Sequence, residues 1–120
     1  MYVHQILNAK GSDVVSIAPE ASIGEALALL AEHEIGAVLV RGAGGVVCGI
    51  LSERDVVRAL ARKGPDCLDA PVSRLMTRDV ISCRPEDSID SVMALMTEKR
   101  VRHLPVMQGG RLGGLISIGD

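Results

Sequence analysis

Hydrophobic and polar positions follow two periods along this chain, and the same order of periods occurs twice. Short runs rich in β-branched residues, each followed closely by a proline, predict strands at 14–17 and 80–83. Each run leads to a serine and then to apolar residues at helical spacing. The pattern therefore predicts one helix near 22–33 and a second near 88–99.

Two further pairs of apolar runs are separated by glycines. Residues 37–40 and 46–51 flank Gly42 to Gly45, and residues 103–107 and 112–116 flank Gly109 and Gly110. Glycine adopts the positive φ of a tight turn at little cost, so each pair predicts a β-hairpin. An amphipathic helix is expected over 54–63, where the chain continues past the first hairpin.

The two halves match residue by residue at a spacing of 66, which falls to 65 after the hairpin turn. The matched pairs are Val14 and Val80, Ser16 and Ser82, Pro19 and Pro85, Ser22 and Ser88, Ala28 and Ala94, Val40 and Val106, Gly49 and Gly114, Ser52 and Ser117, and Asp55 and Asp120. Such a register indicates an internal repeat. We assign 1–66 to the first repeat, with a lead-in helix, and 67–120 to a second repeat that lacks the final helix.

One unit of strand, helix, hairpin and helix cannot cover both faces of its own sheet. Two units related by a pseudo-twofold axis and packed sheet to sheet would bury each other's apolar faces. The predicted fold class is therefore α/β (α+β), built from two β-α-β-β-α repeats. Apolar surface left on the helices could be covered by a second chain, which predicts a homodimer.

Composition narrows the function classes. Hydrophobic residues make up 48% of the chain, and Tyr2 is its one aromatic residue, so the core must be aliphatic. A net charge of -2 and the lack of aromatic stacking platforms argue against binding to nucleic acid or to an anionic membrane. No apolar run reaches the ~20 residues of a membrane span, and a cytoplasmic protein is expected. The apolar surroundings of Cys48 and Cys83 predict buried, reduced thiols.

The strings Gly-Ile-Leu-Ser-Glu-Arg-Asp at 49–55 and Gly-Leu-Ile-Ser-Ile-Gly-Asp at 114–120 are the first candidate site. Ser-x-x-Asp at a helix start is commonly a capping box that satisfies backbone N–H groups. Because the pattern follows the equivalent strand in both repeats, it also allows a second interpretation. Asp55 and Asp120 could accept hydrogen bonds from the vicinal hydroxyls of a ribose, and Ser52 and Ser117 could bind a phosphate oxygen.

A second candidate site lies in the segment Lys-Arg-Val-Arg-His at 99–103. A basic run at a helix end is commonly solvated, but Arg102 and His103 enter the strand that faces the second Ser-x-x-Asp turn. Two such donors could clamp a phosphate. The first repeat has Gly36 and Ala37 at this place, so two ligand clefts would differ in chemistry.

Catalysis is the weakest interpretation. The three histidines lie far apart, no pair of metal-binding Cys or His residues has a suitable spacing, and no nucleophile motif or phosphate loop is present. The sequence predicts no metal site, no catalytic cofactor and no enzymatic activity.

The repeat resembles the cystathionine-β-synthase (CBS) domain, and the pair resembles a Bateman module. The resemblance rests on Val-x-Ser-x-x-Pro-Glu-x-Ser-Ile, on Arg-His-Leu-Pro-Val and on the two Gly-h-h-Ser-x-x-Asp strings, and it spans almost the whole chain. It implies that adenine nucleotides bind in clefts between the repeats and that pairs dimerise. The residues implied for this site are Ser16, Gly36, Ala37, Ser52, Asp55, Ser82, Arg102, His103, Pro105, Ser117 and Asp120.

Two main hypotheses follow from these patterns. In the first, the chain is a regulatory sensor of AMP, ADP, ATP, NAD or S-adenosylmethionine that acts on an unknown effector protein. In the second, it is a dimerisation module without a ligand, and both Ser-x-x-Asp turns serve as caps.

Overall fold

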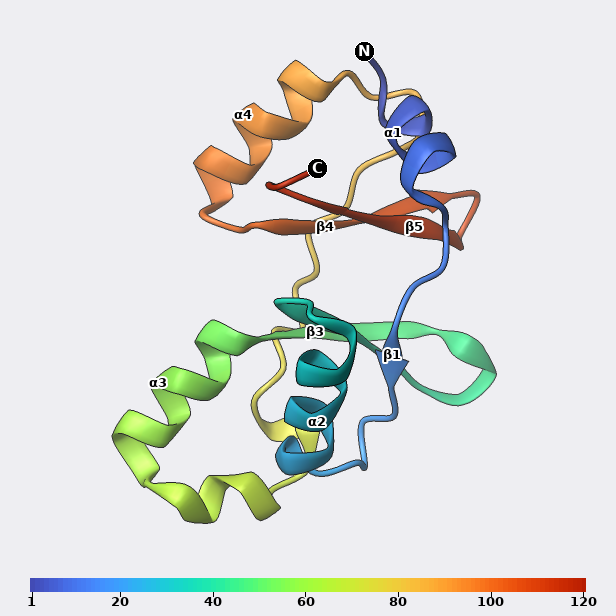
Figure 1. The fold of residues 1–120 in the computed structure, drawn as a ribbon. Coiled ribbons are helices and arrows are strands. Elements are labelled where there is room, and N and C mark those ends of the chain that lie inside the picture. Colours follow the sequence, from blue (N-terminus) through green and yellow to red (C-terminus); the bar gives the residue numbers. More distant parts are fainter. The chain divides into compact units, whose positions relative to one another are not determined.

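The protein divides into two compact units in the computed structural model, which describes residues 1–120 (Figure 1). The central unit comprises Val15–Asp79, and the terminal unit comprises Met1–Val14 with Val80–Asp120. Four α-helices and two small β-sheets give the predicted mixed α/β class. None of the helices is long and apolar enough to cross a bilayer.

The central unit contains a three-stranded sheet in the order β1-β2-β3. β1 runs parallel to β2, and β2 pairs antiparallel with β3. Its elements are β1 (Ser16–Ile17), α2 (Ile23–His33), β2 (Ala37–Arg41), β3 (Val47–Ser52) and α3 (Glu53–Lys63). The predicted helix over 54–63 is thus confirmed, and the predicted strand at 14–17 is confirmed over its last two residues.

The terminal unit repeats this arrangement with one strand fewer and without a counterpart of α3. It contains α1 (Val3–Lys10), α4 (Ile89–Lys99), β4 (His103–Gln108) and β5 (Arg111–Ser117), the last two forming an antiparallel hairpin. The predicted strand at 80–83 is wrong as a full strand, because only Cys83 pairs with Val106, in a single parallel bridge. A β-branched run favours extended backbone, but it cannot by itself provide the partner that a ladder requires.

Serine side chains fix where α2 and α4 begin. The Ser22 hydroxyl accepts a hydrogen bond from the Glu25 backbone N–H at 3.1 Å, and the Ser88 hydroxyl accepts one from Ser91 at 3.1 Å. Glu25 also accepts a bond from the Ser22 N–H at 3.0 Å, which completes the predicted capping box. Both helices end at a left-handed residue, Glu34 with φ 53° and Arg100 with φ 56°.

The two hairpin turns are built differently. β4 and β5 are joined by Gly109 and Gly110, whose φ values of 57° and 78° are typical of a two-residue turn that matches strand twist. The longer connection between β2 and β3 contains a short 3-10 turn, Ala43–Gly45. Both hairpins were predicted from their glycines.

Each unit has its own aliphatic core. In the central unit the largest fully buried side chains include Ile23, Leu39 and Leu51, and in the terminal unit they include Leu104. Cys83 is 3% exposed in the terminal core, and its burial, with a smaller contribution from nearby Asp87, raises the pKa of the thiol to about 11. The predicted packing role of Cys83 is therefore confirmed.

The segment that precedes each repeat packs in the unit of the other repeat. In the terminal unit the backbone N–H of Val3 donates to Asp87 and that of His4 donates to Pro85, at 2.9 and 3.0 Å. In the central unit the N–H groups of Val72 and Ser73 donate in the same way, the first to Ala21 at 2.7 Å and the second to Pro19 at 3.0 Å. The boundaries of the compact units thus differ from those of the repeats. The repeat boundaries at 1–66 and 67–120 stay a prediction.

A glycine in each hairpin lets its docked segment approach the sheet. A Cβ added at Gly49 would lie 2.6 Å from Met76 Sδ and 3.0 Å from the carbonyl oxygen of Thr77, which also exchanges backbone hydrogen bonds with Ile50. A Cβ at Gly114 would lie 2.7 Å from a methyl group of Leu7 on α1, which Figure 1 shows beside β5. Close backbone approach therefore explains glycine at both positions.

Candidate functional site

The first Ser-x-x-Asp turn joins β3 to α3 in the central unit. Asp55 Oδ2 accepts a hydrogen bond from the Ser52 N–H at 3.0 Å, and the Ser52 hydroxyl accepts one from the Asp55 N–H at 3.3 Å. These two bonds form the complete capping box that the sequence allowed. The turn is therefore explained locally without a ligand.

The predicted partners of this turn lie next to it on β2. Ala37 pairs with Ser52 in the sheet, and the carbonyl oxygen of Gly36 accepts a bond from the Glu53 N–H at 2.9 Å. Ser16 lies on the neighbouring strand, where it pairs with Leu39. The structure therefore brings Gly36 and Ala37 to the turn, while Ser16 lies farther along the sheet.

A hollow of about 460 Å³ lies beside this turn rather than at it. Its lining combines apolar side chains with two exposed carboxylates, and Gly36 is the one predicted site residue in it: Leu27, Leu30, Ala31, Glu34, Ile35, Gly36 and Glu53. The negative charges of Glu34 and Glu53 oppose a phosphate group. This hollow is consequently a poor site for an anionic ligand.

The second Ser-x-x-Asp turn follows β5 in the terminal unit. Asp120 Oδ2 accepts a hydrogen bond from the Ser117 N–H at 2.7 Å, and the Asp120 N–H donates to the Ser117 carbonyl oxygen at 3.0 Å. His103 pairs with Ser117 across the hairpin, and the Arg102 carbonyl oxygen accepts a bond from Ile118 at 2.9 Å. Of the predicted basic pair, His103 thus begins β4 beside the turn, and Arg102 directly precedes that strand.

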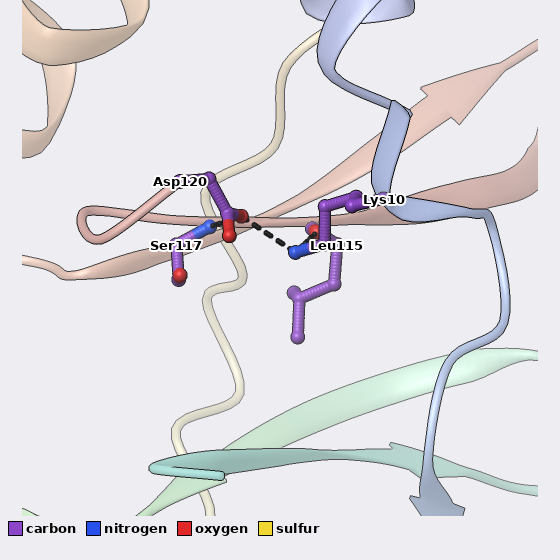
Figure 2. Close-up of polar contacts among 4 residues, drawn as sticks. All are labelled: Lys10, Leu115, Ser117 and Asp120. Carbon is purple, nitrogen blue, oxygen red and sulfur yellow. Dashed lines mark hydrogen bonds and ion pairs between the residues drawn. The ribbon is translucent and has the colours of Figure 1, made fainter. Parts of the chain in front are cut away.

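Lys10 is a member of this turn that the sequence did not predict. Its ammonium donates to Asp120 Oδ2 at 2.5 Å and to the carbonyl oxygen of Leu115 at 2.9 Å (Figure 2). Lys10 ends α1, which reaches the hairpin because the first lead-in segment docks in the terminal unit. No local pattern could have indicated a contact across 110 residues of sequence.

The electrostatic setting keeps the Asp120 carboxylate ionised. Partial burial alone would raise its pKa, but hydrogen bonds from Lys10 and Ser117 and the charge of Lys10 lower the pKa below its ordinary value. Because the folded-state pKa is depressed, this group stabilises the fold above its unfolded pKa, and the contribution is lost as pH falls through the folded pKa. Asp120 is therefore a charged acceptor at neutral pH.

The other two predicted residues of the terminal unit differ in accessibility. Ser82 is exposed, directly before the bridge residue Cys83. Pro105 is fully buried, and its carbonyl oxygen accepts a bond from Cys83 at 3.0 Å. The ring of Pro105 belongs to the packed interior, so Ser82 is the more accessible of the two.

A third turn shows that this backbone geometry does not by itself indicate a ligand. Asp87 Oδ2 accepts from the Arg84 N–H at 2.8 Å, and the Asp87 N–H donates to the Arg84 carbonyl oxygen at 3.0 Å. The same two bonds occur at Ser117 and Asp120. What distinguishes the second Ser-x-x-Asp turn is the ion pair of its aspartate with Lys10, because Asp87 forms no ion pair in the third turn.

Comparison with known proteins identifies the class. The CBS domain family model matches residues 8–62 and 72–120. The chain belongs to the CBS domain family, as a pair of repeats.

No cluster of three or more His, Cys, Asp or Glu side chains is placed to hold a metal ion.

Individual relatives agree with this assignment. The crystal structure of the CBS-domain containing protein ATU1752 from Agrobacterium tumefaciens matches with a TM-score of 0.97 and 49% identity, covering 99% of this chain and 89% of that one. YhcV of Bacillus subtilis is 31% identical over 109 residues, 91% of this chain and 76% of that protein. The CBS domain pair of protein MJ0100, solved in complex with 5′-methylthioadenosine and S-adenosyl-L-methionine, is 25% identical with a TM-score of 0.88, covering 100% of this chain and 91% of that one.

Proposed function

We propose that this protein is a regulatory module that binds an adenine nucleotide, and that the turn from Ser117 to Asp120 is part of the binding site. The observation that carries the proposal is the state of Asp120. Ser117 and Lys10 both donate to Oδ2, so they fix the carboxylate while Oδ1 takes neither bond. A ribose presents two adjacent hydroxyl donors, and an oriented carboxylate is a suitable acceptor for them.

The surroundings of the turn suit the rest of such a ligand. His103 begins the adjoining strand β4, Arg102 directly precedes it, and both could bind phosphate beside Ser117. The adenine ring would have to pack on aliphatic side chains, because the chain has no Phe or Trp and one Tyr. The adenosine ligands in the structure of the MJ0100 pair support this choice of ligand class.

The equivalent turn of the central unit is a weaker candidate. Ser52 and Asp55 have the family pattern, but they bond mainly to each other, and their neighbours are Gly36, Ala37 and Glu53 rather than basic residues. We propose that it binds an adenine nucleotide less tightly than the second turn. Ser16 and Ser82 are proposed to lie near the base.

Calorimetric titration of the whole chain with AMP, ADP, ATP, NAD and S-adenosylmethionine tests the proposal. We expect saturable binding of at least one of these compounds, and GMP serves as the control for selectivity toward the adenine base. If none of the five compounds binds at millimolar concentration, the proposed function is wrong.

Two observations favour a second candidate function, a dimerisation module without a ligand. The Ser52 and Asp55 box is satisfied within the protein, and two large apolar side chains on the helices are exposed, Val57 at 63% and Met93 at 42%. A homodimer could cover them. Sedimentation that reports the same dimer with and without every nucleotide, together with no calorimetric binding, would favour this candidate.

As a regulatory module, the protein would act on an effector protein in the cytoplasm and would catalyse no reaction itself. Ligand binding would favour one arrangement of the chain over another, and the effector would respond to that shift in population.

A further inference from the structure

Lys10 is placed to do more at the second turn than hold Asp120. An ammonium group has three N–H donors, and Lys10 uses one on the Leu115 carbonyl oxygen and one on Asp120 Oδ2. Its side chain keeps 37% of its surface exposed, while that of Asp120 keeps 20%. One donor and an accessible positive charge therefore remain beside the carboxylate (Figure 2).

The position of Lys10 is specific to one of the two turns. The lead-in segments dock in the same way, through Val3 in the terminal unit and Val72 in the central unit. The first segment is longer, since it runs from Val3 to Val14 and the second runs from Val72 to Val80. Lys10 lies in this longer stretch. No cation pairs with Asp55 in the central unit, although Asp55 has the same place in its own turn.

We propose that Lys10 is a ligand-binding residue that makes the second turn selective for phosphorylated adenosines over neutral or cationic ones. The inference rests on the proposed function, since it assigns a ligand class to the same site. Lys10 bonds to the Asp120 carboxylate, and Arg102 and His103 lie in the segment whose backbone pairs with the turn, so basic residues outnumber acidic ones in these segments. A nucleotide 5′-phosphate gains from that charge, adenosine does not, and the sulfonium of S-adenosylmethionine is repelled.

The same geometry explains how one lysine can serve both parts of a nucleotide. By binding Oδ2, Lys10 lowers the pKa of the Asp120 carboxyl and leaves Oδ1 for the ribose hydroxyls. Its flexible stem lets the remaining donor turn toward the phosphate on the same sugar. A lysine is suited to this task because it binds phosphate as a point charge and needs no fixed bidentate geometry.

The test compares Lys10→Met with Lys10→Arg and with a matched control, Lys63→Met. Lys63 also ends a helix, α3, but lies in the central unit and forms no ion pair. Affinities for AMP, adenosine and S-adenosylmethionine are measured by calorimetry at low and high salt. Circular dichroism of each variant confirms that the comparison is made on folded protein.

We expect the wild type to prefer AMP to adenosine, and AMP to S-adenosylmethionine. Lys10→Met should reduce the ratio of AMP to adenosine affinity by about three- to tenfold and weaken its salt dependence, because a partly exposed charge-assisted bond is lost. Lys10→Arg should keep most of the ratio, and Lys63→Met should leave it unchanged.

Two results would overturn the inference, and they differ in what else they reject. If Lys10→Met lowers the AMP and adenosine affinities by the same factor, Lys10 only positions Asp120, and the proposed function stands. If the wild type binds none of the three compounds, the proposed function fails and the assignment of Lys10 fails with it.

Discussion

Gly49→Ala should lower the free energy of unfolding by about 1–3 kcal/mol, the usual range for overpacking a well-packed site. The added Cβ would lie 2.6 Å from Met76 Sδ, 2.9 Å from Met76 Cγ and 3.0 Å from the Thr77 carbonyl oxygen. The Thr77 backbone is tied to Ile50 by hydrogen bonds of 2.8 and 3.0 Å, so it cannot move away without losing them. The cost therefore reports on how the lead-in segment docks on β3.

Gly113→Ala is the matched control for this substitution. Gly113 is also a strand glycine, but its added Cβ would meet only the Val106 carbonyl oxygen, at an ordinary 3.5 Å. It should be neutral or slightly stabilising, because alanine lowers the entropy of the unfolded chain. Urea titration followed by far-UV circular dichroism measures both variants, since the chain has no tryptophan. Equal midpoints for both would contradict the docking of Met76 and Thr77 on Gly49.

Asp120→Asn should weaken nucleotide binding by about 10- to 100-fold, the equivalent of about 1.5–3 kcal/mol for hydrogen bonds to a charged group. Asparagine can still accept the bond from the Ser117 N–H, so the turn should persist. It has one oxygen rather than two, however, and no charge to pair with Lys10. Two ribose hydroxyls would then share a single weaker acceptor.

Asp87→Asn provides the control, because Asp87 makes the same two bonds with Arg84 that Asp120 makes with Ser117. It lies in the same unit and has no predicted ligand contact. Calorimetry should show unchanged affinity for this variant. A similar loss from both substitutions would mean that the effect arises from the stability of the terminal unit, and an unchanged affinity in Asp120→Asn would remove Asp120 from the site.

The helices and hairpins of each repeat could be predicted because their signals are local. Ser22 and Ser88 mark where two helices begin, and Gly109 and Gly110 mark a turn with positive φ. The strand at 80–83 was predicted too long for the same reason. A β-branched run indicates extended backbone, whereas the single bridge of Cys83 depends on which partner atoms lie within reach.

Contacts between distant segments could not be predicted in this way. Periodicity shows that the segment around Val3 is helical, but it does not show which repeat buries it. The contact of Lys10 with Asp120 depends on that docking, so it was invisible in the sequence. The motif residues of the candidate site could thus be proposed from the sequence, whereas the contact of Lys10 with Asp120 could not.

Comparison of the two repeats also predicted that the two turns differ in their basic residues, and the structure adds Lys10 to that difference. Arg102 and His103 have Gly36 and Ala37 as their counterparts, and Lys10 adds a positive charge at the second turn. The two turns share a backbone pattern but differ in electrostatics. A single ligand should therefore discriminate between them.

Titration of ¹⁵N-labelled protein with AMP, followed by amide correlation spectra, tests whether the second Ser-x-x-Asp turn binds a nucleotide, because the shifts locate the ligand on the chain. We predict saturable shifts that are largest for the amides of Arg102, His103, Ser117 and Asp120 and that are absent at Arg84 and Asp87. Spectra that do not change at millimolar AMP, or shifts confined to residues outside the two Ser-x-x-Asp turns, would show that AMP binds at neither turn.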